Sequence, residues 1–203
     1  MNPQTVAIVG NGPVDPEAAS AIDSSGCVIR FNRPPHGPEA GSRTDILFFM
    51  NSGKSAQTHL SDPSYLAHPA VAGCRQVILP YDRQVIARYH PKPNFLSRLK
   101  GRHEDWTAKA IEVFCGQGKE VAILPTSFYE LCCDELRIAP EERRQAFPST
   151  GFLAIVYAMK EFPRTEWPIS LYGFGWCGWK RHDWRAERKW VEEKARSGQL
   201  TVV

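Results

Sequence analysis

Residues 6–12, VAIVGNG, are the stretch that decides the fold of this chain. A short β-branched run that passes directly into a glycine-rich turn, and then into a helix-forming segment at residues 16–19, is typical of a strand, a tight turn and a helix. A second apolar run, residues 27–29, ends in the polar sequence RFNR at residues 30–33. Because parallel strands deliver their carboxyl ends to one edge of a sheet, these two strands are predicted to bring two polar loops together at a nucleotide-binding edge.

The rest of the chain repeats this alternation of apolar runs and amphipathic segments. Further strands are predicted at residues 46–50, 76–80, 120–125, 168–172 and 200–203. Residues 51–74 are polar and irregular, and they predict a loop with a short helix over the sheet edge. Residues 81–104 are basic and interrupted by proline, which fits a solvated face or an acceptor or phosphate surface. Strands that alternate with helices predict one domain over residues 1–203, an α/β fold with a Rossmann-like, mostly parallel sheet and helices on both faces.

The composition is that of an ordinary soluble globular protein. Charged residues make up 23% and hydrophobic residues 42% of the chain, and the formal net charge of +3 is too balanced to indicate nucleic-acid binding by charge alone. No apolar run of about 18 residues occurs and the first four residues do not resemble a signal peptide, so we expect no membrane span and a cytoplasmic location. The six cysteines have neither CxxC nor zinc-finger spacing, and reduced thiols are expected.

Three motifs of nucleotide or sugar chemistry are missing from the sequence. The third glycine position of a GxGxxG fingerprint is Asp15, and the second strand ends near Asn32, where a dinucleotide site needs a carboxylate for the ribose. The pattern GxxxxGK[ST] does not occur. Nor does Asp-x-Asp, the pair of carboxylates that usually holds a divalent ion in metal-dependent glycosyltransferases. A dinucleotide oxidoreductase and an ordinary ATPase or GTPase are therefore disfavoured, and chemistry without a metal or other cofactor is expected.

Three sets of residues, in order along the chain, resemble the motifs of the sialyltransferases, glycosyltransferase family 29. The first, with IVGNG, VIRFN and GSRT inside residues 8–44, is similar to the large motif of that family. The second, from PSTGF to YGFG inside residues 148–175, is similar to the small motif. The third, His182 followed by Glu187, is similar to the very-small motif. The resemblance implies a GT-A-like variant of the α/β fold, and it leaves the middle of the chain unmatched.

The resemblance implies a metal-independent, inverting transferase whose donor is a CMP-activated acidic sugar, such as sialic acid or Kdo, with an unknown glycan or small-molecule acceptor. By position, the nucleotide of the donor would be bound by Gly10, Asn11, Gly12, Asn32, Ser149, Thr150, Gly151 and Gly173. An Asn amide offers both a donor and an acceptor, glycine allows backbone approach, and free N–H groups at a helix start bind anions. The structural alternatives are a turn residue at Asn11 and a plain helix cap at Ser149 or Thr150.

The resemblance also assigns the role of general base to His182. A neutral imidazole, with an unperturbed pKa of about 6.5, can remove the proton of an attacking acceptor hydroxyl. A surface histidine is the alternative. The sequence HDW at residues 182–184 is also similar to a remnant of the family's third motif, in which the histidine would assist the leaving phosphate instead.

If the leaving nucleotide needs further charge stabilisation, it would come from Lys180, Arg181 or Arg30. Glu187 is expected to orient the start of the last helix.

Two features qualify the resemblance. The cysteines that bridge the large and small motifs in the family fall on Val6 and Phe162, so an apolar contact is expected in place of a disulfide. The third motif is shortened, and the stretch available for an acceptor, residues 51–147, is small. A catalytically inactive accessory protein that binds CMP or another nucleotide is therefore the alternative function.

Overall fold

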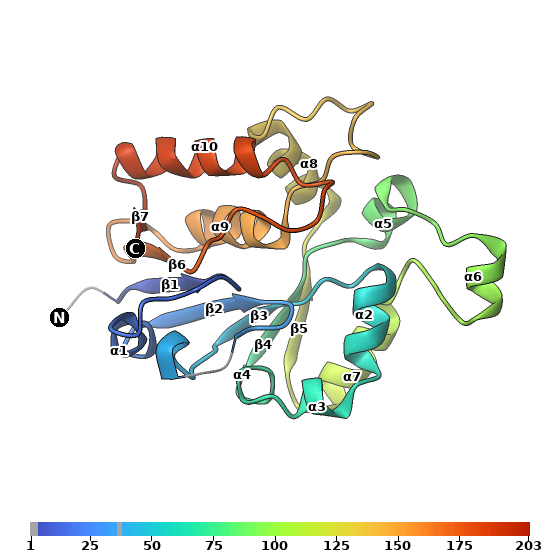
Figure 1. Cartoon of the computed structure of the whole chain (residues 1–203), viewed down its shortest axis with the longest axis horizontal. Coiled ribbons are helices and arrows are strands. Elements are labelled where there is room, and N and C mark those ends of the chain that lie inside the picture. Colours follow the sequence, from blue (N-terminus) through green and yellow to red (C-terminus); the bar gives the residue numbers. More distant parts are fainter. Residues whose placement is uncertain (1–3, 36–37) are drawn as a thin grey trace.

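One parallel β-sheet with helices on both faces forms the molecule, as a computed structural model shows for residues 4–35 and 38–203 (Figure 1). The sequence of residues 34–38, PPHGP, predicts a turn-rich connector, and its residues 36 and 37 lie outside the described ranges. Within them the sheet has seven strands, all paired in parallel, in the order β5-β4-β3-β2-β1-β6-β7. The strands are β1 (Val6–Val9), β2 (Cys27–Phe31), β3 (Ile46–Phe48), β4 (Gln76–Leu79), β5 (Glu120–Ile123), β6 (Ile169–Tyr172) and β7 (Thr201–Val202). Each predicted strand is present, so the predicted fold class is confirmed.

Figure 1 shows α8, α9 and α10 over one face of the sheet and α1, α2, α3, α4 and α7 over the other. The helices are α1 (Ala18–Asp23), α2 (Gly53–Leu60), α3 (Pro63–Leu66), α4 (Pro69–Ala72), α5 (Arg83–Tyr89), α6 (Phe95–Leu99), α7 (Thr107–Gly116), α8 (Thr126–Glu135), α9 (Thr150–Glu161) and α10 (Trp184–Arg196), with one 3-10 turn at Pro38–Ala40. Within the described ranges, no helix combines the length and the apolar character needed to cross a membrane.

For residues 51–74 the sequence predicted a loop with one short helix. This prediction is wrong in detail, because the segment forms the three helices α2, α3 and α4. The physical reason lies in two local start signals. Asp62 caps α3 by accepting a hydrogen bond from the N–H of Ser64 at 2.9 Å, and Pro63 occupies the first position of that helix. Polar composition had concealed these short helices, which bury only a few apolar residues such as Tyr65.

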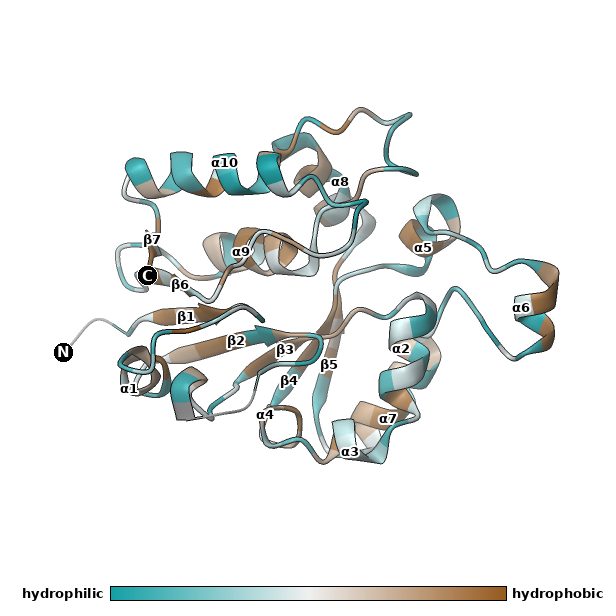
Figure 2. Cartoon of the chain, in the orientation of Figure 1, coloured by the Kyte–Doolittle hydropathy of each residue, from teal (hydrophilic) through white to brown (hydrophobic). Residues whose placement is uncertain are grey.

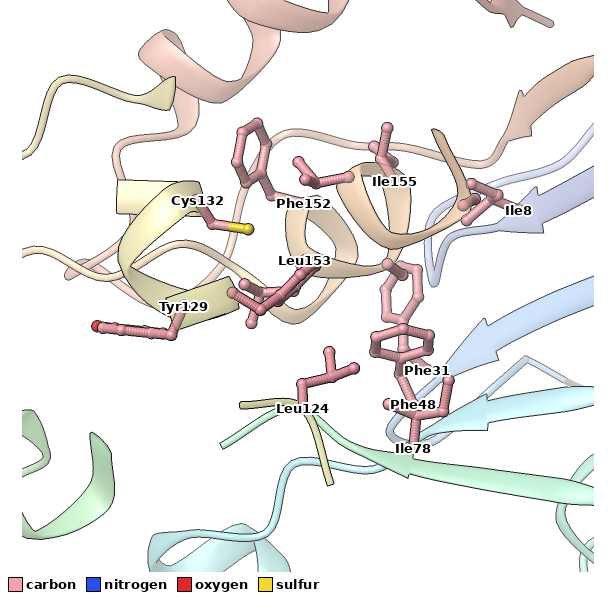
Figure 3. Packing of buried hydrophobic residues seen from close by; sticks show 14 of the residues in the cluster. Ile8, Phe31, Phe48, Ile78, Leu124, Tyr129, Cys132, Phe152, Leu153 and Ile155 are labelled. Atoms are coloured by element: carbon pink, nitrogen blue, oxygen red, sulfur yellow. The ribbon is translucent and has the colours of Figure 1, made fainter. Parts of the chain in front are cut away.

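The core consists of apolar layers on both faces of the sheet, because side chains alternate along each strand. In β3, Phe48 belongs to the cluster that includes Leu153 of α9, whereas Leu47 belongs to the cluster that includes Phe114 of α7. Figure 3 shows the first of these layers, in which Phe48 and its neighbours on the sheet face the side chains of α8 and α9. In an open parallel sheet with helices on both faces, a ligand is expected to bind outside the carboxyl ends of the strands.

Candidate functional site

A cavity of about 800 Å³ lies at the carboxyl edge of the sheet. All eight residues predicted to bind the nucleotide line it: Gly10, Asn11, Gly12, Asn32, Ser149, Thr150, Gly151 and Gly173. His182 and Glu187 line it as well. We call residues 10–12, 149–151 and 173–175 the inner wall of the pocket, and residues 52–55, 90–93 and 102–103 the outer wall. The two walls come from different ends of the sheet, and the large and small motifs supply the inner one.

The glycines of the inner wall hold two loops against each other. The N–H of Gly10 donates to the Tyr172 carbonyl at 2.7 Å, and the N–H of Gly12 donates to the Gly173 carbonyl at 2.8 Å. A Cβ on Gly10 would lie 2.3 Å from the Gly173 oxygen, and Gly173 itself has a φ of +66°. Close backbone approach is therefore required here between the loop after β1 and the loop after β6.

Asn32 and Asn11 differ in the hydrogen bonds that they make within the protein. Asn32 has a φ of +55°, which Asn tolerates better than most residues, and its Oδ1 accepts from the N–H of Met50 at 3.1 Å. The Tyr65 hydroxyl donates to the Asn32 carbonyl at 2.7 Å. The Asn11 amide makes one long bond, 3.4 Å, to the Phe31 carbonyl. The turn role considered for Asn11 thus belongs to Asn32, whose amide nitrogen is the part left for a ligand.

Ser149 caps α9 and is tied to Glu187. Its Oγ accepts from the N–H of Phe152 at 3.1 Å and donates to Glu187 Oε2 at 2.6 Å, while its own N–H donates to Glu187 Oε1 at 2.7 Å. Glu187 is fully buried. Burial raises the pKa of this carboxyl to about 7, although the bonds from Ser149 act in the opposite direction. Glu187 therefore joins the first turn of α10 to the start of α9.

His182 is held in one orientation on the rim of the pocket. Its Nδ1 lies 2.8 Å from the carbonyl oxygen of Phe147. Because a carbonyl can only accept, Nδ1 carries the proton and Nε2 keeps its lone pair. The ring also makes edge contacts with Trp179 and Trp184, at centroid distances of 5.2 and 4.9 Å. Burial lowers the pKa of His182, with a smaller opposite contribution from the Phe147 carbonyl, so the imidazole is neutral near pH 7.

The three cations suggested for the phosphate do not line the cavity. Arg30 is fully buried, and its guanidinium donates to the carbonyls of Ala40 at 2.6 Å and Arg43 at 3.0 Å. Side chains alternate along β2, so Phe31 lines the pocket and its neighbour Arg30 does not.

Lys180 and Arg181 precede the last helix, and neither meets the pocket. Lys180 is exposed, and the guanidinium of Arg181 lies over the Trp179 ring at 5.6 Å. Their contact with the phosphate stays a prediction.

The sequence analysis named no individual site residue on the outer wall, although it allowed residues 81–104 as an acceptor or phosphate surface. Ser52 Oγ lies 2.7 Å from His90 Nδ1, and burial lowers the pKa of His90 to about 4. Lys54, Lys92 and Arg102 complete this wall, which contains no acidic residue. A signal was available for part of it, because the polar residues 51–55 directly follow the strand predicted at residues 46–50, as polar residues follow the first two strands. No group of three or more potential metal-ligating side chains comes together in the part of the chain that the structure describes.

The fold and the pocket define a Rossmann-like α/β protein whose site lies at the carboxyl edge of a parallel sheet. The sequence profile of glycosyltransferase family 29 (sialyltransferase) matches residues 2–189, and the chain belongs to this family. The earlier resemblance is thereby confirmed.

Two solved structures share the fold. A crystal structure of a mammalian sialyltransferase is similar with a TM-score of 0.60 and 20% identity, over 98% of this chain and 68% of that chain. A mammalian sialyltransferase in complex with Gal-beta-1-3GalNAc-ortho-nitrophenol is similar with a TM-score of 0.56 and 17% identity, over 98% of this chain and 69% of that chain.

One curated relative is similar over nearly its whole length. A urease operon 23 kDa accessory protein from Rhizobium meliloti (strain 1021) is 29% identical over 205 residues, which are 97% of this chain and 91% of the relative. Family and fold together support a glycosyltransferase of the sialyltransferase type.

Proposed function

We propose that this protein is an inverting glycosyltransferase that uses a CMP-activated acidic sugar, sialic acid or Kdo, as donor, with His182 as general base. The observation that carries the proposal is the bond between His182 Nδ1 and the Phe147 carbonyl, because it leaves a neutral Nε2 on the pocket rim. The membership in glycosyltransferase family 29 supports the choice of donor class.

In the proposed reaction, the oxygen of an acceptor hydroxyl attacks the anomeric carbon of the donor sugar from the face opposite the nucleotide. The bond from that carbon to the phosphate oxygen breaks, and CMP leaves with the electron pair. The hydroxyl proton passes to Nε2 of His182. The sequence has no Asp-x-Asp, which is why we propose a reaction without a metal ion.

The nucleotide would lie along the inner wall. The N–H and the hydroxyl of Ser149 both donate hydrogen bonds to Glu187. The first free amides of α9 are therefore those of Thr150 and Gly151. Thr150 and Gly151 line the pocket, and free amides at the start of a helix suit a phosphate or the polar edge of a cytosine. The amide nitrogens of Asn11 and Asn32 provide further donors from the loops after β1 and β2.

The direct experiment measures CMP release from CMP-sialic acid and CMP-Kdo by the unaltered chain and by His182→Ala. Loss of a general base is expected to lower the rate by about a hundredfold or more. The matched control is His103→Ala, since His103 also lines the pocket but is exposed on the outer wall. An unaltered rate in His182→Ala would remove His182 from the mechanism.

The pH dependence separates the two roles considered for His182. A base must be neutral, so the rate should fall as the pH drops through the pKa of His182, which burial holds below its ordinary value of 6.5. A histidine that assists the leaving phosphate must carry a positive charge. In that case the rate should rise, and not fall, as the pH drops through its pKa.

A nucleotide-binding accessory protein without transfer activity is the second candidate, and the shortened third motif and the small stretch available for an acceptor motivate it. The Rhizobium meliloti relative is named an accessory protein, but that name specifies no chemistry. Calorimetric titration with CMP separates the two candidates. Binding of CMP without turnover of either CMP-sugar favours the accessory function, and absence of CMP binding contradicts both.

A further inference from the structure

Residues 91–103 form a projecting segment, which we call the finger, that carries α6 away from the rest of the molecule (Figure 1). Its base is held by α2, where the Gln57 side chain donates to the Gly101 carbonyl at 3.0 Å. Its turn is ordered by Asn94, whose Oδ1 accepts from the N–H of Ser97 at 2.8 Å. The finger is therefore a capped helical turn with a fixed base, and its tip is presented to solvent.

The tip of the finger is apolar. Phe95, Leu96 and Leu99 are 75%, 68% and 69% exposed. Their spacing puts them on one side of a helical turn, and Figure 2 shows the hydrophobic colour of α6 at the far end of the projection. Among the described residues, the other exposed large apolar side chains occur singly or as the pair Val202 and Val203. Three such side chains on one exposed turn indicate an interaction surface.

Cations surround this apolar tip. The finger contains Lys92, Arg98, Lys100 and Arg102 and no Asp or Glu. Arg98 forms a long ion pair with Glu104, in which the guanidinium nitrogen and the Oε1 atom are 3.9 Å apart. Apolar side chains flanked by Lys and Arg match an anionic lipid surface, because the apolar groups enter the acyl boundary while the cations remain at the level of the phosphates. A second copy of this chain would bring the same charges together, which disfavours a finger-to-finger contact.

We propose that the finger docks on an anionic lipid surface and brings the mouth of the pocket to that surface. The two sides of the finger fit this arrangement, since Lys92, Ser97 and Arg102 line the pocket while the apolar side chains of α6 are exposed. Docking through the tip leaves the outer wall facing the layer of lipid headgroups. A lipid-linked acceptor follows only if the proposed transferase activity holds, whereas the docking does not depend on it.

The test is sedimentation of the whole chain with vesicles of phosphatidylcholine alone and of phosphatidylcholine mixed with phosphatidylglycerol, without any donor sugar. We expect binding to the mixed vesicles, weakened by salt, and at least about tenfold weaker binding to phosphatidylcholine alone. The triple variant Phe95→Ser, Leu96→Ser, Leu99→Ser should bind the mixed vesicles at least about tenfold less. The matched control, Val202→Ser with Val203→Ser, removes exposed apolar groups elsewhere and should bind as the unaltered chain does.

Circular dichroism of the triple variant checks that the fold is kept, and an added reporter, Leu96→Trp, should show a blue shift of its emission on mixed vesicles. Equal binding to both kinds of vesicle overturns the choice of an anionic surface. No vesicle binding by the unaltered chain, or full binding by the triple variant, overturns the docking itself. A dimer in light scattering that disappears in the triple variant, together with no vesicle binding, would assign the finger to a second copy instead. None of these results depends on CMP-sugar turnover, so they leave the proposed function to its own test.

Discussion

The inner and outer walls of the pocket are built in opposite ways. On the inner wall several polar groups are already bonded within the protein, as in the pair of bonds between Ser149 and Glu187 and the backbone bonds of Gly10 and Gly12. On the outer wall Lys54, Lys92 and Arg102 have side chains on or near the surface. Substitution of an inner-wall residue therefore costs stability as well as binding, whereas the exposed cations of the outer wall can change with little cost to the fold.

The largest expected effect is that of Gly10→Ala. The added Cβ would lie 2.3 Å from the Gly173 oxygen, a backbone atom that cannot move aside cheaply. We expect a loss of about 3 kcal/mol in the free energy of unfolding, measured by denaturant titration, and loss of CMP binding. Gly116→Ala is the matched control, because a Cβ there meets nothing within 4 Å. Equal stability of the two variants would show that the loops after β1 and β6 are not tightly packed.

A second prediction concerns pH. Burial raises the pKa of Glu187 from 4.5 to about 7, so the folded chain binds more protons than the unfolded chain between these values. The contribution of Glu187 is therefore most favourable below pH 4.5 and is lost as the pH rises to about 7, a change of about 3 kcal/mol. Glu187→Gln removes this dependence.

The measurement is the difference in unfolding free energy between Glu187→Gln and the unaltered chain at several pH values. Relative to the unaltered chain, the variant should gain stability as the pH rises through this window. Taking the difference cancels the titration of other groups, such as His90, whose lowered pKa gives a dependence of opposite sign. A difference that does not change with pH would contradict the burial of an ionisable Glu187.

Ser149→Ala should have the next largest effect. It removes the side-chain cap of α9 and the hydroxyl bond to the buried carboxyl of Glu187, while the backbone N–H of residue 149 can still donate to Glu187. We expect a loss of about 2 kcal/mol in unfolding free energy and weaker CMP binding in calorimetry. Ser149→Thr, which keeps a hydroxyl, should recover most of the stability. If Ser149→Ala weakened CMP binding alone, the serine would be a ligand contact and not a structural one.

The smallest effect is expected on the outer wall. Arg102→Gln should change the unfolding free energy by less than about 0.5 kcal/mol, since the side chain is exposed. CMP affinity should stay within a few-fold of the unaltered value, because the inner wall binds the nucleotide in our proposal. A large loss of CMP affinity in Arg102→Gln would indicate that the donor binds at the outer wall as well. It would then contradict the proposed difference in role between the inner and outer walls.

The sequence by itself determined the sheet, because hydrophobic periodicity and glycine turns are local signals: the run at residues 6–9 and the turn after it could be read without any partner. It also placed Asn11 and His182 on the pocket. Only the tertiary structure decided what these residues are joined to. Ser149 and Glu187 lie 38 positions apart in sequence, as do Ser52 and His90, and bonds between such distant groups exist only once the topology has brought their elements together. The sequence likewise could not predict that the tip of the finger is exposed. A short apolar turn has the same sequence pattern whether it is buried in a core or projects into solvent.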